Sequence, residues 1–264
     1  MPLFLASFLV IRGAPAMLLY RKLLDTRDRA ALAFFSAMPG WRDAIDASVC
    51  FLPAPKPGGR LLEVGFGNAG TLLWMRELGW DVMGIEADPV AVKNSRALGL
   101  DTRLGNLKSH NFPDASFDAI YASHVLEHVH DPLGLMEECY RILKPGGVVV
   151  MMTPNLTGWG HSRFKGDWTL LDSPRHLMLF SPENARTLLQ KAGFRRGRVR
   201  TSARAAFVYF AMAELNRRLG RLDGLKGGWP GWAMRRGYVQ HLIENFLMVV
   251  NPQIGDELVI MAKK

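Results

Sequence analysis

From residue 60 onward, the chain alternates between short apolar runs and longer segments whose apolar residues recur at helical spacing. The short runs predict strands and the longer segments predict helices. Asp88 followed by a proline is typical of a helix start. The predicted strands are 61–64, 81–85, 102–104, 117–122, 148–152, 194–201 and 257–261, and the predicted helices are 71–78, 89–97, 132–143 and 181–192. This alternation predicts an α/β fold in which helices wrap a mostly parallel sheet.

A helical region precedes this alternation. Residues 16–50 carry apolar positions at helical spacing, and three prolines between residues 53 and 57 then make a stiff, non-helical connector. We therefore expect an N-terminal helical cap with its linker at 1–57 and a main domain at 58–264.

The first twenty residues are apolar, but Arg12, Gly13 and Pro15 interrupt them. The uninterrupted run is too short for a membrane span, and no positive charge precedes it as in a signal peptide. We expect either a packed helix or a segment lying on a surface. The two cysteines form no CxxC pair, which fits a reducing compartment, so the protein is expected in the cytoplasm.

Two further helices are predicted before the last strand, at about 204–221 and 232–250, and they form a helical insertion at about 202–252. The formal net charge of +9 is concentrated nearby, because cationic side chains outnumber anionic ones by ten within 191–236. Basic residues beside bulky apolar ones predict peripheral membrane contact through these two helices. Nucleic-acid stacking and a solvated basic face are the alternatives.

A glycine-rich turn follows the first predicted strand, with Gly65, Gly67 and Gly70 in a GxGxxG pattern. Ligands of a doubly wound sheet bind beyond the carboxyl ends of its strands. Gly65 and Gly67 permit a tight turn close to the ligand, and Gly70 is expected to let the helix pack closely on the strand. Glu86, which ends the second strand, is placed to accept ribose hydroxyls. The pattern alone fits dinucleotides equally well.

Glu63, two residues before the first glycine, distinguishes a dinucleotide from a ligand that contains an amino acid. Its carboxylate suits the ammonium of an amino acid and would repel a pyrophosphate, which disfavours an NAD-dependent dehydrogenase. The motif series resembles class I S-adenosylmethionine (SAM)-dependent methyltransferases, in the broad subgroup that includes the ubiquinone-biosynthesis O-methyltransferases. The matching motifs are LLEVGFGNAG (61–70), GIEADP (84–89), GNL (105–107), FPDASFDAIYASHVLEHVHDP (112–132) and LKPGGVVVMMTPN (143–155).

The resemblance implies a doubly wound, Rossmann-like sheet of seven strands whose last strand is antiparallel, and SAM as cofactor. In such enzymes the methionine part of SAM would be held by the glutamate before the turn and by the turn itself. The acid that ends the second strand would bind the ribose, and the GNL motif would bind the adenine. Two residues after the fourth strand would lie beside the sulfonium. The implied cofactor residues are Glu63, Gly65, Phe66, Gly67, Gly70, Glu86, Ala87, Asn106, Leu107, Ser123 and His124.

Two positions depart from this family pattern. Phe66 stands where many relatives have a small residue, and Asn106 stands where many have an aspartate. The amide oxygen of Asn106 can still accept a hydrogen bond from the adenine amino group. We therefore expect SAM binding to survive.

Methyl transfer from a sulfonium is an in-line displacement, so the protein mainly positions the acceptor and removes its proton. His124, His128 and His176 are the candidate catalytic residues, because imidazole accepts protons near neutral pH. A purely structural role at a helix start or in a loop is the alternative for the first two.

A metal site is a second hypothesis for the same segment. Small-RNA 2′-O-methyltransferases resemble it and use a Glu-x-x-Glu-His motif completed by a later histidine. Glu127, His128 and His176 match that set, but His124 replaces the first glutamate. We therefore expect no metal, with these three matching residues as the alternative site.

The acceptor is expected at the polar, aromatic loop after the fifth strand. Its LDSPRHL segment (171–177) resembles one in bacterial methyltransferases linked to lipids and surface glycans. Arginines there suit phosphate or carboxylate, although Asp172 and Arg175 also fit an ion pair that only holds the loop. The predicted function is O-methylation of a small, lipid-linked or glycan acceptor; RNA methylation and a non-catalytic SAM-binding module are the alternatives. The candidate acceptor residues are Trp159, His161, Arg163, Trp168 and Arg175.

Overall fold

The computed structural model describes residues 41–220 and 229–264. Contacts divide the chain into two compact units. The first, called here the sheet unit, comprises 52–156, 171–200 and 258–264, and the second, the helical unit, takes the remaining segments. The boundaries expected from the sequence stay predictions, and the expected N-terminal cap lies, up to residue 40, outside the described residues.

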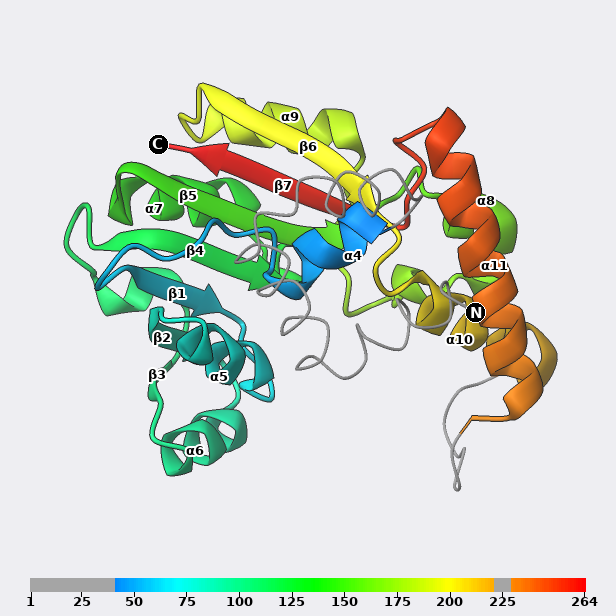
Figure 1. Ribbon diagram of the computed structural model, residues 1–264, viewed down its shortest axis with the longest axis horizontal. Helices are drawn as coiled ribbons and strands as arrows, with labels where there is room; N and C mark the ends of the chain where they lie inside the picture. The colour runs from blue at the N-terminus through cyan, green and yellow to red at the C-terminus, as the bar shows by residue number, and fades with distance from the viewer. Residues whose placement is uncertain (1–40, 221–228) are drawn as a thin grey trace, which may run out of the picture. The chain divides into compact units, whose positions relative to one another are not determined.

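The sheet has seven strands in the order β3-β2-β1-β4-β5-β7-β6 (Figure 1). β1 is parallel to β2 and β4, β2 to β3, and β4 to β5. Lys264 exchanges backbone hydrogen bonds with Gly146 and Gly147, which joins the end of β7 to the start of β5, so β7 is antiparallel. This confirms the expected fold. The strands are β1 Arg60–Val64, β2 Asp81–Glu86, β3 Asp101–Leu104, β4 Phe117–Ser123, β5 Leu143–Pro154, β6 Arg196–Ser202 and β7 Glu257–Lys263.

The helices of the sheet unit begin where the sequence provides caps. Asp88, Asp131 and Ser181 each accept a hydrogen bond from a backbone N–H of the first turn, and a proline follows each of them. These caps explain why the helix starts could be predicted from the sequence. The elements are α5 Gly70–Glu77, α6 Pro89–Ala97, α7 Pro132–Ile142 and α9 Pro182–Lys191, with 3-10 turns η1 Leu107–His110 and η2 Leu126–His128.

The core lies along the central strands. Leu62, Ile120 and Met151 are completely buried, as expected for parallel strands covered on both faces. The sequence predicted a helix that ends at 143 and a strand that begins at 148, with residues 144–147 outside both. Instead β5 begins at Leu143, which pairs with Phe117, and the next pair is Ala119 with Val148. Residues 144–147 therefore form a bulge inside the strand.

The helical unit contains α4 Trp41–Ser48, α8 Trp159–Phe164, η3 Lys165–Asp167, η4 Thr169–Leu171, α10 Ala206–Leu219 and α11 Gly231–Val250. α10 and α11 confirm the two helices expected before the last strand. The two helices pack closely because Gly237 has no side chain: a Cβ there would lie 2.2 Å from the carbonyl oxygen of Phe207. The ring of Phe207 stacks on Tyr238. Within the described ranges, every helix falls short of the length or the apolarity that a bilayer crossing demands.

Candidate functional site

The glycine-rich turn follows the carboxyl end of β1, as the sequence indicated. Gly65 and Gly67 have φ angles of +71° and +55°, which favour glycine. A Cβ on Gly65 would lie only 2.3 Å from Cγ2 of Val125. Gly65 therefore has no room for a side chain, whereas Gly67 has room and is favoured by its φ angle alone.

Gly70 and Phe66 differ from expectation. Gly70 does not let a helix pack on a strand: it lies exposed at the start of α5, where its N–H donates to Oδ1 of Asn68 at 3.0 Å. Phe66 is almost completely buried, and its ring lies 2.6 Å from where a Cβ on Gly84 would be. The bulky side chain fits because β2 has a glycine opposite it, so it is the backbone of Phe66 that belongs to the turn.

Glu63 is buried at the end of β1. Its Oε2 has no hydrogen-bond partner within the described part of the chain. Burial raises the pKa of this carboxyl to about 8; a hydrogen bond from Thr71 opposes the shift and the charge of Glu86 adds to it. A buried carboxylate oxygen without a partner fits a cationic group of a ligand, such as the ammonium of SAM.

Glu86 connects the end of β2 to the turn. Its Oε2 accepts a hydrogen bond from Gly67 N–H at 2.9 Å, and its Oε1 accepts from Ala87 N–H at 2.8 Å and Asp88 N–H at 3.2 Å. The carboxylate is thus held beside the turn, at the carboxyl edge of the sheet. The expected contact with a ribose stays a prediction.

Asn106 caps η1, since its Oδ1 accepts a hydrogen bond from Ser109 N–H at 3.0 Å. Asparagine and aspartate serve this role about equally well, which accounts for the departure seen in the sequence. Asn106 and Leu107 line a cavity of about 430 Å³ together with His128. The residues expected at the adenine thus share a cavity with a candidate catalytic histidine.

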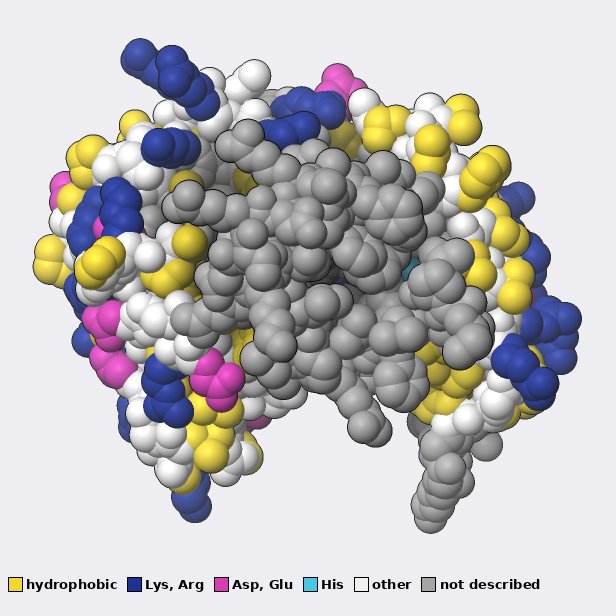
Figure 2. Space-filling view, viewed as in Figure 1, with side chains coloured by type: hydrophobic (Ala, Val, Ile, Leu, Met, Phe, Trp, Pro, Cys, Tyr) yellow, Lys and Arg dark blue, Asp and Glu magenta, His cyan; other side chains and the backbone are white. Residues whose placement is uncertain are grey.

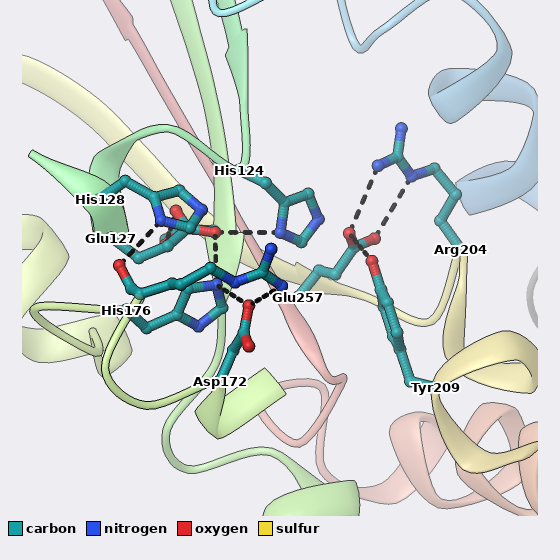
Figure 3. Close-up of polar contacts among 10 residues, drawn as sticks. His124, Glu127, His128, Asp172, His176, Arg204, Tyr209 and Glu257 are labelled. Atoms are coloured by element: carbon teal, nitrogen blue, oxygen red, sulfur yellow. Dashed lines mark hydrogen bonds and ion pairs between the residues drawn. The ribbon is translucent and has the colours of Figure 1, made fainter. Parts of the chain in front are cut away.

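A second group of polar side chains surrounds Glu127, just beyond β4 (Figure 3). Glu127 is completely buried, and its Oε1 lies 3.0 Å from Nδ1 of His124. Its Oε2 accepts a hydrogen bond from Oγ1 of Thr153 at 2.9 Å. Nε2 of His176 lies 3.9 Å from Glu127 Oε1 and 3.9 Å from Oδ2 of Asp172. We call His124, Glu127, His128 and His176 the histidine cluster.

His128 is the exposed member of the cluster. Its Nδ1 lies 2.9 Å from the carbonyl oxygen of Arg175, which can only accept, so Nδ1 carries the proton and Nε2 the lone pair. The ring of His176 meets it edge to face at 4.7 Å. The three candidate catalytic histidines therefore lie together around Glu127, and their catalytic role stays a prediction.

The geometry also permits the alternative metal site. One ligand atom each from Glu127, His128 and His176 can be chosen so that all lie within 4.8 Å of one another. Imidazole nitrogens and a carboxylate are a donor set typical of zinc and other divalent ions. Whether the protein binds a metal stays open to experiment.

The candidate acceptor residues divide between the two units. In the sheet unit, Arg175 pairs with Asp172 at 2.5 Å, so the ion pair that we weighed as a loop-holding role is present. In the helical unit, Trp168 is buried and Trp159 packs on Phe210, while the remaining two are His161 and Arg163. Acceptor binding by all five stays a prediction.

Sequence reasoning missed Thr153, which holds Glu127 from the neighbouring strand β5. It is the first polar residue after the apolar run of that strand, and this position was the available signal. Parallel strands bring their carboxyl ends to one edge, so a polar residue there is expected near its counterparts.

A family model described as "Methyltransferase domain" matches residues 37–196. A probable SAM-dependent methyltransferase of Mycolicibacterium smegmatis is 33% identical over 139 residues, which cover 52% of each chain. The ubiquinone biosynthesis O-methyltransferase of Cereibacter sphaeroides is 31% identical over 153 residues, covering 53% of this chain and 62% of the relative. The match thus spans between half and two thirds of these relatives' own length.

Solved structures agree on the fold. The crystal structure of a SAM-dependent methyltransferase from Archaeoglobus fulgidus superposes with a TM-score of 0.55 at 19% identity, covering 90% of this chain and all of the other. The family match covers more than half of the chain and includes the turn, Glu63, Glu86 and the histidine cluster. The chain therefore belongs to the SAM-dependent methyltransferases.

Proposed function

We propose that the protein transfers a methyl group from SAM to an oxygen atom of a small, lipid-linked or glycan acceptor. The observation that carries this proposal is the histidine cluster beyond β4, in the same unit as the glycine-rich turn. A hydroxyl acceptor must lose its proton during methyl transfer, and histidine is the side chain most often used for this step. The similarity to ubiquinone biosynthesis O-methyltransferases supports oxygen as the methylated atom.

When bound, SAM supplies an electrophilic methyl group. In this proposal the carboxylate of Glu63 binds the ammonium of the methionine part, and the backbone of the turn at Gly65 and Gly67 lies against it. Glu86 accepts the ribose hydroxyls, and Asn106 with Leu107 borders the adenine. Ser123 and His124 then stand beside the reacting atoms, together with the other cofactor residues expected from the sequence.

His128 is the residue that we propose as the base. Its Nε2 carries the lone pair, because Nδ1 donates to the carbonyl of Arg175. His128 is exposed and lines the cavity that Asn106 and Leu107 share, so an acceptor can reach it. His176, packed edge to face on this ring, is a positioning residue.

The test compares three single variants in a labelled-methyl assay. We expect His128→Ala to lower turnover by roughly 10²- to 10⁴-fold and His176→Ala to lower it less, while the Kd for SAM stays the same. His110→Ala makes the same change at a histidine outside the lining of this cavity, so it is the matched control and should keep wild-type turnover. Unchanged turnover in His128→Ala with the true acceptor would refute the assignment.

A metal held by Glu127, His128 and His176 is the second candidate, favoured by their ligand atoms lying within 4.8 Å. In that case these three side chains would hold the ion, and the ion would bind and polarise the acceptor oxygen. Elemental analysis and titration with Zn²⁺, Mg²⁺ and Mn²⁺ would show one ion per chain in the wild type and none in His176→Ala. Full turnover by metal-free protein would exclude a required metal and leave the base in place.

The acceptor is to be found with methyl-labelled SAM and separate lipid, glycan, quinone and RNA fractions. Label in the lipid, glycan or quinone fraction supports the proposal, with Arg175 and the four candidate residues of the helical unit as its proposed contacts. Label in RNA alone would establish the RNA alternative instead. SAM binding without label in any fraction would point to a non-catalytic module.

A further inference from the structure

The last three turns of α11 present an unusual surface. Every exposed side chain there is apolar, and Phe246 and Val250 keep 69% and 80% of their surface accessible. These residues are three or four positions apart, so they form one stripe along the helix. We call the stripe the α11 face; it consists of Val239, Leu242, Ile243, Phe246, Val249 and Val250.

The α11 face continues into a basic end. Arg235 and Arg236 are exposed and lie one turn before Val239 on the same side of the helix. The one acidic residue of α11, Glu244, is completely buried and accepts a hydrogen bond from the backbone N–H of Asp256. In Figure 2, hydrophobic side chains run along the edge where Figure 1 draws α11, with Lys and Arg side chains beside its first turns.

The positive charge at this end is only partly compensated. Arg236 and Arg218 share the carboxylate of Glu214, at 3.1 and 4.0 Å. Arg235 has no acidic partner within the described residues, and its Nε donates to the carbonyl of Gly231. A partner that covers the α11 face must therefore be apolar along most of its length and anionic at one end.

A second copy of the chain does not meet this requirement. A two-fold dimer through the α11 face would bring the same patch together twice. Among the described residues that patch holds arginines and no accessible acid, so Arg235 of each copy would meet apolar residues or another cation. A bilayer with anionic headgroups supplies both the apolar layer and the negative charge.

We propose that α11 docks on an anionic lipid surface, with the α11 face in the interfacial region and Arg235 and Arg236 at the headgroup phosphates. Trp229 is exposed just before the helix, and exposed indole rings favour a membrane interface. Trp232, in the first turn, is partly buried beneath the guanidinium of Arg218. The helix lies in the plane of the surface rather than across it. None of these residues belongs to the turn or the histidine cluster, so docking does not depend on the proposed chemistry.

The test is flotation of the full chain with vesicles of phosphatidylcholine alone or with an equal part of phosphatidylglycerol. We expect binding to the anionic vesicles that weakens as salt is raised. Leu242→Gln with Phe246→Gln should lower the partition coefficient by about tenfold or more. The matched control is Val90→Gln with Leu98→Gln, which makes the same kind of change at exposed apolar positions in α6 and directly after it, and it should alter the partition coefficient by less than about twofold.

Insertion can be located with an environment-sensitive dye on Phe246→Cys, with Val90→Cys as the control; the native Cys50 and Cys139 are buried. The emission should shift to the blue with vesicles only at position 246. Wild-type flotation by the α11 double variant would overturn the proposal. So would a lipid-free dimer, seen by sedimentation, that this variant abolishes. Unchanged SAM binding in the variants shows that they are folded, and it keeps this test separate from that of methyl transfer.

Discussion

If Glu63 binds the ammonium of SAM, as we propose, SAM binding is coupled to the release of a proton. Burial raises the pKa of its carboxyl to about 8 in the ligand-free protein, so the group is mostly protonated at pH 7. A neutral carboxyl cannot form an ion pair with an ammonium. Binding must therefore release a proton from Glu63 whenever the pH is below this pKa.

The magnitude follows from the distance between the pH and the pKa. With a pKa of about 8, roughly one molecule in ten has an ionised Glu63 at pH 7, and roughly one in a hundred at pH 6. The observed affinity for SAM should therefore rise about tenfold per pH unit between pH 6 and 7.5. It should level off near pH 8, where free α-amino groups begin to lose their own proton.

The assay is isothermal titration with SAM at pH 6, 7 and 8 in two buffers of different ionisation enthalpy. The difference between buffers should correspond to nearly one proton released per SAM bound at pH 6 and to less at pH 8. Glu63→Gln removes the titrating group while keeping an acceptor oxygen, so its weaker binding should be nearly independent of pH. Equal wild-type affinity at pH 6 and 8, without proton release, would refute the reasoning.

Two further predictions concern stability. Burial raises the pKa of both Glu244 and Asp256. Their contribution to stability is therefore present below their unfolded pKa near 4 and is lost as the pH rises toward 7 and above. In urea unfolding from pH 5 to 8, Glu244→Gln should lose less stability than the wild type, and parallel stability curves for the two proteins would contradict this. Gly84→Ala should cost about 1–3 kcal/mol because its Cβ would lie 2.6 Å from both the Phe66 ring and Cδ1 of Leu72. Gly84→Ala with Phe66→Ala removes one of these two contacts, so it should cost less than the sum of the two single changes; simple additivity would argue against the Phe66 contact.

Most elements of the fold could be predicted because their signals are local. Asp88 and Ser181 mark helix starts by side chain–backbone hydrogen bonds within a single turn. The features that escaped depend on residues far apart in the chain. The bulge at 144–147 is set by pairing with Phe117, and Gly160 has no room for a side chain because the carboxylate of Asp256, 96 residues later, accepts its N–H. No periodicity or turn signal reports such a contact.

The residues of the histidine cluster differ in burial, and the sequence motif alone did not indicate this difference. Glu127 is completely buried, and such a carboxylate needs partners, here His124 and Thr153. Replacing His124 would leave that carboxylate short of a partner and disturb the whole cluster, so lost turnover in His124→Ala would not identify a catalytic group. His128 is exposed, and its ring hydrogen-bonds to a loop carbonyl rather than to Glu127, so its removal leaves the partners His124 and Thr153 of Glu127 in place. Turnover of His128→Ala is therefore the measurement that distinguishes chemistry from architecture at this site.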